Sequence, residues 1–173
     1  MPSFRPAAPA DIVALHALIE SAYRGESARR GWTHEADLLG GQRTDRDALA
    51  AMIADPRQTL ILAEEAGALV GCVLVADKHG RGYLGLLTVS PALQGGGLGR
   101  QLIAEAERHA RDGLGAAFME MTVIKQRREL IDWYVRCGYA DTGREEPFPL
   151  DDVRFGEPRT RALVFVVLEK RLG

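Results

Sequence analysis

The chain is poor in cysteine and has no long apolar run, and both absences narrow what it does. Its two cysteines, Cys72 and Cys137, lack the clustered Cys and His spacing of a zinc site. We read both as small buried hydrophobic residues and expect no metal. No stretch approaches the roughly 20 apolar residues that span a bilayer, and the first residues lack the charged-then-apolar profile of a secretory leader. The sequence therefore predicts a cytoplasmic protein without membrane insertion.

A dominant charge of one sign is also missing. The chain has 22 basic and 24 acidic residues, a formal net charge of −2 and a pI near 6.1. Basic and acidic side chains are interspersed, so we expect no nucleic-acid partner. The length of 173 residues and the apolar share of 46% are ordinary for a globular protein, and no repeat, linker or low-complexity tract divides the chain. We expect one domain over residues 1–173.

Hydrophobic periodicity predicts a mixed α/β fold. Helical spacing of apolar residues covers 10–23, 45–54, 98–110 and 126–136. Apolar runs typical of strands cover 3–5, 59–63, 69–75, 84–89, 117–124 and 162–168. This order, with a three-stranded meander in the middle and a strand pair at the end, indicates a mixed sheet covered by helices, in which 162–168 is central. Residues 24–44 show little periodicity and form a candidate substrate loop.

The most informative segment runs from Leu86 to Arg100, where an apolar strand passes through a turn into glycines and then into an amphipathic helix. Glycines let the backbone approach a ligand, and the unpaired N–H groups of the first helical turn attract an anion. The pattern predicts a phosphate cradle to which Arg100 adds a positive charge. A Walker loop needs a lysine after the glycines, and a dinucleotide fingerprint needs Gly or Ala at position 100, so neither fits. A plain strand-to-helix turn is the alternative.

What remains, Gln94-x-x-Gly97-x-Gly99, resembles the acyl-CoA pyrophosphate loop of the GNAT superfamily of N-acetyltransferases. Residues 130–139 resemble that superfamily's helix bearing Leu-Tyr, three residues and then Gly-Phe or Gly-Tyr, with Trp133 in place of the usual leucine. The resemblance spans nearly the whole chain and is weakest over 24–44 and 145–161. It implies a single-domain GNAT-like α/β fold, whose mixed, mostly antiparallel sheet is splayed in the middle and flanked by helices. It also implies direct transfer of an acetyl group from acetyl-CoA to a primary amine.

On that resemblance, the strand before the loop holds the pantetheine arm like an added strand, through Leu87, Thr88 and Val89. A bulge there would leave the Val89 N–H free to stabilise an oxyanion. The cofactor-binding residues of the loop are then Gln94, Gly95, Gly96, Gly97, Leu98, Gly99 and Arg100. Many GNAT members carry an asparagine seven residues before the tyrosine, where this chain has Arg127. Either Arg127 or Arg128 would instead reach a phosphate of CoA, or the pair is a solvated helix start.

The same resemblance makes Tyr134 the acid that protonates the leaving thiolate, although its helical spacing also suits a core aromatic. The usual strand glutamate is missing from residues 83–86, so Glu120 is the candidate base. It interrupts an otherwise apolar strand. There, either desolvation raises the pKa of the carboxylate so that it can act as a base, or a water molecule bridges the carboxylate to the amine. An edge-exposed glutamate facing solvent is the alternative.

Substrate recognition is expected in the irregular loop, where Trp32, Glu35 and Asp37 would hold an ammonium group by charge and cation–π contact, or begin a helix. Three arginines would bind a substrate carboxylate instead: Arg43, Arg46 and Arg154. The expected function is N-acetylation of a small polar or cationic metabolite. The amine remains open among a polyamine, an amino acid, an amino sugar and a peptide terminus. A non-catalytic CoA-binding module and a protein or peptide acetyltransferase are the alternatives, and the superfamily allows a homodimer.

Overall fold

The computed structural model describes residues 1–24, 38–149, 156–160 and 162–173. Its strands are β1 (Ser3–Pro6), β2 (Leu39–Gly40), β3 (Gln58–Glu65), β4 (Ala68–Lys78), β5 (Arg81–Val89), β6 (Phe118–Ile124), β7 (Ala140–Pro147), β8 (Glu157–Pro158) and β9 (Val164–Arg171). Its α-helices are α1 (Ile12–Tyr23), α3 (Arg46–Ala54), α4 (Leu98–Arg108) and α5 (Arg128–Arg136). Two short 3-10 helices, η1 (Pro9–Asp11) and η2 (Pro91–Leu93), and a π-helical segment, η3 (His109–Gly113), complete them. The main sheet has seven strands in the order β1-β3-β4-β5-β6-β9-β7, and β2 pairs with β8.

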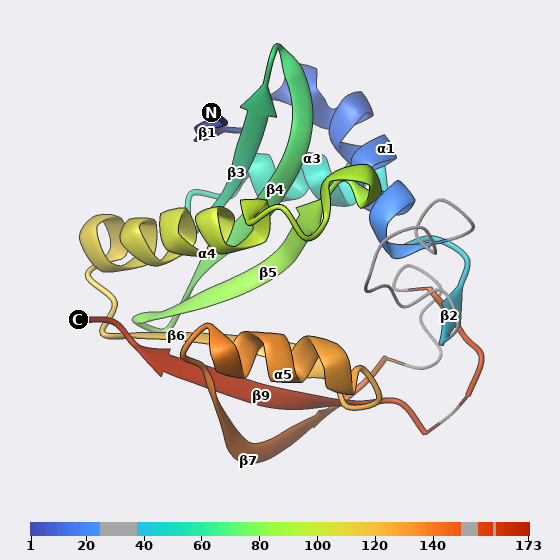
Figure 1. Ribbon diagram of the computed structural model, residues 1–173, viewed down its shortest axis with the longest axis vertical. Coiled ribbons are helices and arrows are strands. Elements are labelled where there is room, and N and C mark those ends of the chain that lie inside the picture. Colours follow the sequence, from blue (N-terminus) through green and yellow to red (C-terminus); the bar gives the residue numbers. More distant parts are fainter. Residues whose placement is uncertain (25–37, 150–155, 161) are drawn as a thin grey trace.

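Helices cover both faces of the main sheet (Figure 1). On one face, α1 and α3 bury Leu15, Ile19 and Leu49 completely against β3 and β4. On the other face, α4 and α5 share a larger core that includes Leu102 and Tyr134. The strand pairings are antiparallel except for β5 with β6, which is parallel. The expected mixed, mostly antiparallel sheet flanked by helices is confirmed.

The predicted elements match the observed ones to within a few residues. Local chemistry sets several ends: the Asp45 carboxylate accepts a hydrogen bond from the Ala48 N–H at 2.7 Å and begins α3, and Gly138, at φ +101°, follows the end of α5. The apolar strand β9 lies between β6 and β7, so both its edges are paired, although it is one place from the sheet edge. No range was predicted for β7, whose largely exposed, polar residues are typical of an edge strand.

A bulge in β5 reverses which side chains face which helix layer. The register of β4 against β5 shifts after Cys72, and Leu86 has a positive φ of 48°. Leu84 packs in the core beneath α4, whereas Leu86, two residues later, packs in the core beneath α1. Without the bulge, alternation would place both on one face. The bulge therefore re-aims the last residues of β5, from Leu87 to Val89.

Strands β5 and β6 pair over only two positions, Gly82 with Met119 and Tyr83 with Glu120. Beyond them the strands separate, which confirms the expected splay in the middle of the sheet. A hydrogen bond of 2.8 Å between the Tyr83 hydroxyl and the Thr122 Oγ1 crosses the gap just past the last pair.

Ion pairs stabilise the end of this gap at which β5 and β6 are still paired, called the joined end, and Glu120 lies at their centre. Its side chain, 5% exposed, lies 2.8 Å from the Lys78 Nζ and 3.1 Å from the Arg81 Nε, and Arg81 also contacts Glu169 on β9. One carboxylate thus links β4, β5 and β6. Burial alone would raise the pKa of Glu120, but the hydrogen bonds and charges of Lys78 and Arg81 hold it below its ordinary value.

We expect Glu120→Gln to lower the free energy of unfolding by about 1–3 kcal/mol at neutral pH, because two cations lose their buried partner. A carboxyl group with a lowered folded-state pKa stabilises above its unfolded pKa, and this stabilisation is lost as the pH falls through the folded value. The difference between wild type and variant should therefore shrink in acid. Urea denaturation at several pH values measures it. As a control, Glu145→Gln removes a half-exposed pair with Lys125 and should change stability by less than about 0.5 kcal/mol.

Candidate active site

Two cavities meet where β5 and β6 separate. The first, of about 200 Å³, lies over the glycine loop and is the loop cavity. The second, of about 380 Å³, lies between the parted strands and is the splay cavity. Five residues line both cavities: Tyr23, Leu87, Arg127, Leu130 and Tyr134. These residues form a common wall between the two spaces.

The glycine loop presents open backbone to the loop cavity. Gly95 and Gly97 have φ values of +88° and +90°, and a Cβ built on either meets nothing within 4 Å. Gly97 precedes α4 without a side-chain cap, so the first N–H groups of the helix remain available. Gln94, Gly99 and Arg100 also line the cavity. A helix start of this kind, with an arginine beside it, suits an anion.

Two residues expected to bind the cofactor, Leu98 and Gly96, do not line the loop cavity. Leu98 is 8% exposed and belongs to the core, so it offers the cavity no side chain, and Gly96 is exposed outside the lining. Gly99 packs tightly: a Cβ there would lie 3.1 Å from the Trp133 Cη2, so α4 and α5 meet across the gap through Gly99 and Trp133. Within α5, the centre of the Trp133 ring lies 5.1 Å from the centre of the Tyr134 ring.

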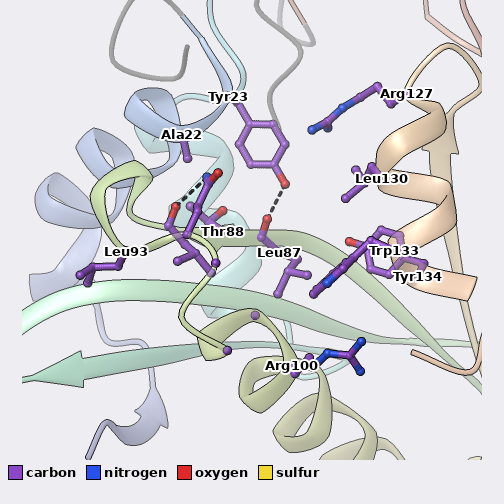
Figure 2. Close-up of a pocket in the computed structure, with 15 residues that line it drawn as sticks. Ala22, Tyr23, Leu87, Thr88, Leu93, Arg100, Arg127, Leu130, Trp133 and Tyr134 are labelled. Atoms are coloured by element: carbon purple, nitrogen blue, oxygen red, sulfur yellow. Dashed lines mark hydrogen bonds between the residues drawn. The ribbon is translucent and has the colours of Figure 1, made fainter. Parts of the chain in front are cut away.

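The end of β5 turns its peptide groups toward the cavity. The Ser90 N–H donates to the Val70 carbonyl at 2.9 Å, and hydrogen-bonded pairs alternate along an antiparallel ladder, so Val89 directs its N–H and C=O away from β4. The Val89 carbonyl accepts from the Gln94 Nε2 at 3.3 Å, and the Leu87 carbonyl accepts from the Tyr23 hydroxyl at 2.6 Å (Figure 2). Thr88 turns inward, and its hydroxyl donates to the Leu86 carbonyl.

Tyr134 stands on α5 and faces both cavities. Its side chain is 6% exposed, and its hydroxyl has no hydrogen-bond partner among the residues that the structure describes. Burial raises the pKa of Tyr134 far above its ordinary value, the nearby Tyr23 adds to this rise, and the positive charge of Arg127 opposes it. The phenol therefore keeps its proton and remains a donor at any physiological pH.

Arg127 precedes α5 and is 6% exposed, so it is no solvated helix start. Figure 2 shows it at the Tyr23 end of the loop cavity, away from Arg100 beside α4. Because it also lines the splay cavity, its position favours the thioester and acceptor end over the phosphates expected at the glycine loop. Arg128 is exposed and lines neither cavity.

The structure does not bring Glu120 to the site. Its carboxylate lines neither cavity and is not exposed at an edge. Desolvation does not raise its pKa overall, because Lys78 and Arg81 neutralise it where β5 and β6 are still paired. We therefore correct its expected part from base to structural anion. The apolar strand pattern could not reveal two cations supplied by neighbouring strands.

The expected substrate residues are only partly described. Trp32, Glu35, Asp37 and Arg154 lie outside the described residues. Arg43 lines the splay cavity, with its guanidinium carbon 5.0 Å from the centre of the Tyr23 ring. Arg46 is exposed on α3 and lines neither cavity.

Sequence reasoning misses several aromatic residues of the site, among them Tyr23, Phe148 and Phe165. Tyr23 ends an amphipathic helix, and its spacing matches that helix's apolar stripe. Phe148 and Phe165 line the splay cavity with ring centres 5.1 Å apart. Phe165 lies within a predicted apolar strand, and Phe148 lies where neither helix nor strand is predicted. An aromatic residue in either setting is a weak signal of a site, because residues of the hydrophobic core have the same spacing.

Cysteine, metal and membrane features offer no competing site within the described ranges. Cys72 is fully buried, and burial raises the pKa of its thiol to about 12, whereas Cys137 is only half-buried. In these ranges His, Cys, Asp and Glu form no group of three suited to a metal ion. Nor does any described helix have the length and apolar character to cross a membrane.

Comparison with known proteins agrees with this geometry. The acetyltransferase (GNAT) domain model matches residues 23–154. The chain is 33% identical over 102 residues to an IAA acetyltransferase of Azospirillum brasilense, and 34% identical over 100 residues to an aminoalkylphosphonate N-acetyltransferase of Salmonella typhimurium (strain LT2). These matches cover 57% and 54% of this chain and 65% and 64% of the relatives, so the chain spans just under two thirds of each.

A solved structure extends the likeness of fold to the whole chain. A Salmonella typhimurium protein, described as an acetyltransferase and solved with its cofactor acetyl-CoA, superposes with a TM-score of 0.70. The two chains are 20% identical, and the alignment covers 100% of this chain and 95% of the other. The family match takes in the glycine loop, the parted strands and α5, and the chain belongs to the acetyltransferase (GNAT) domain family.

Proposed function

We propose that the chain is an acetyl-CoA-dependent N-acetyltransferase that acylates a primary amine of a small polar molecule directly. One observation carries the proposal: the parted strands expose the backbone of Leu87 and Val89 between an uncapped helix start and a buried tyrosine hydroxyl. Family membership supports it. A cytoplasmic location, a single domain and a homodimer stay predictions.

The residues of the loop cavity fit acetyl-CoA. The open backbone at Gly95 and Gly97, the first turn of α4 and Arg100 would hold the pyrophosphate. Leu87 and Val89 would pair with the pantetheine arm, for which the Tyr23 hydroxyl must release the Leu87 carbonyl. When bound, acetyl-CoA supplies a thioester carbonyl that an amine attacks.

The protein's own groups then act on charge and protons. The Val89 N–H, directed away from β4, would stabilise negative charge that develops on the carbonyl oxygen. The Tyr134 hydroxyl would donate its proton to the departing sulfur. Neither step needs a covalent bond to the enzyme, which agrees with the buried, high-pKa thiol of Cys72.

The acceptor would enter through the splay cavity and meet the thioester at the common wall. Among the described residues lining the two cavities, Glu146 is the one carboxylate, and its Oε1 lies 3.8 Å from the Lys78 Nζ. We therefore assign no carboxylate base, and the amine proton would leave to solvent. A cationic acceptor was expected from Trp32, Glu35 and Asp37, which lie outside the described residues. One relative's name describes an amine that carries a phosphonate.

We expect Gly97→Val to weaken acetyl-CoA binding by more than about tenfold, because valine at φ +90° is strained and its side chain enters the cradle. Calorimetric titration measures the dissociation constant. Gly67→Val is the matched control: its φ is +78° and its surroundings are equally open, but it lies in the β3–β4 turn. Equal binding by both variants would mean that the loop is only structural.

Tyr134→Phe should lower kcat by about 10²-fold with little change in acetyl-CoA affinity, because it removes one proton donor and keeps the aromatic packing. Thiol release with an acetylated amine measures kcat, and calorimetry measures the affinity. An unchanged kcat would remove the acid role. Absence of thiol release with every amine, despite acetyl-CoA binding, would favour a non-catalytic binding module.

The pH dependence should have one rising limb. An amine with an ordinary pKa near 10 reacts as the neutral base, so kcat/KM should rise with pH toward that value. The raised pKa of Tyr134 keeps the phenol protonated over the same range, so no falling limb should appear below about pH 10. A pH profile of kcat/KM checks this, and a fall between pH 8 and 10 would contradict it.

A further inference from the structure

Two backbone carbonyls at the end of β5 are paired with side chains of the protein itself. Hydrogen-bonded pairs alternate along the β4–β5 ladder, so Leu87, like Val89 two residues later, directs its peptide groups away from β4. The Leu87 carbonyl accepts a hydrogen bond from the Tyr23 hydroxyl at 2.6 Å, and the Val89 carbonyl accepts one from the Gln94 Nε2 at 3.3 Å. A backbone carbonyl left unpaired in partly buried surroundings is costly. These side chains therefore take the place of a neighbouring strand.

Tyr23 makes the shorter of these two contacts, and other residues position its ring. It is the last residue of α1, and its hydroxyl reaches Leu87 at the common wall of the two cavities (Figure 2). The guanidinium carbon of Arg43 lies 5.0 Å from the centre of its ring. Three residues earlier on α1, the Glu20 Oε1 accepts hydrogen bonds from the N–H groups of Arg43 and Thr44 at 2.7 and 2.9 Å. Because the protein holds the ring in place, the hydroxyl loses little conformational freedom in this bond.

The acyl donor needs the carbonyl that Tyr23 occupies. In the proposed function, the pantetheine arm pairs with Leu87 and Val89 as an added strand would, and its amide N–H groups donate to backbone carbonyls. The Tyr23 hydroxyl and an N–H group of the arm are then directed to the same oxygen, from the same side of β5. Binding of the arm therefore exchanges one hydrogen bond of the Leu87 carbonyl for another.

We infer that Tyr23 is an intramolecular competitor of acetyl-CoA: its hydroxyl pairs with the Leu87 carbonyl when no donor is bound, gives way to the pantetheine arm, and returns as CoA leaves. The inference rests on the proposed function and adds a regulatory contact to its donor site. The contact weakens the binding of substrate and product alike, because both carry the arm. Since product release limits turnover in many enzymes, a contact that lowers the affinity for CoA favours turnover.

Tyr23→Phe tests the competition, since it removes the hydroxyl and keeps the ring with its packing. We expect the affinities for acetyl-CoA and for CoA each to increase by about threefold to tenfold, because one competing hydrogen bond is lost. Calorimetric titration measures both dissociation constants. The phosphoadenosine diphosphate part of CoA lacks the pantetheine arm and should bind wild type and variant equally. Unchanged or weaker binding of CoA would overturn the inference, since the carbonyl would then accept from both groups at once. An equal gain for the part without the arm would also overturn it.

Tyr139→Phe is the matched control. It removes the hydroxyl of another buried tyrosine, which donates to the Glu107 Oε1 at 3.0 Å and lines neither cavity. Because no carbonyl of β5 is involved, this variant should not increase the affinity for CoA. A similar gain in both variants would mean that loss of any buried hydroxyl loosens the donor site, and the competition at Leu87 would then be wrong.

Titration of the wild-type protein separates this inference from the proposed function. If the wild-type protein binds neither acetyl-CoA nor CoA, the proposed function fails. If it binds both, and Tyr23→Phe binds them no more tightly, the function stands and the inference fails. Binding of acetyl-CoA by Tyr23→Phe also shows that the variant is folded.

Discussion

Strands β5 and β6 share two residue pairs and then separate, and the site depends on that separation. A continuous ladder would bury the peptide groups of Leu87 and Val89 in the sheet. The separation is held from both ends: the buried Glu120 fastens the joined end, and Trp133 against Gly99 spaces α5 from α4 at the open end. The bulge at Leu86 then orients the exposed residues. Rigid packing on both sides thus keeps open a gap that hydrogen bonding would otherwise close.

Charge is distributed unevenly along this gap, and it has different effects at the joined end and at the common wall. At the joined end, the cations surround an anion and stabilise the fold. At the common wall, Arg127 is buried beside a phenol whose own ionisation is suppressed. The positive charge of Arg127 lowers the pKa of that phenol, but burial raises it by more, so the phenol keeps its proton.

The sequence predicted the elements and the glycine loop because both depend on local patterns. Periodicity located the helices and strands, and the Gln94-to-Arg100 spacing located the helix start that lines the loop cavity. It did not predict the surroundings of Glu120, which depend on cations from the adjacent strand β5 and from β4 beyond it. Nor did it predict the site position of Tyr23, which depends on how α1 lies against β5. Arg127 was found by its place in a motif, but its burial between two cavities is a tertiary property.

The wall shared by the two cavities has a thermodynamic consequence. Tyr23, Arg127 and Tyr134 face both spaces, so a ligand that shifts one of these side chains changes what the other space offers. Linkage then requires that each ligand alter the affinity for the other by the same factor. Substitutions in this wall are consequently pleiotropic. A change that alters the affinity for the amine here also alters the binding of the acyl donor.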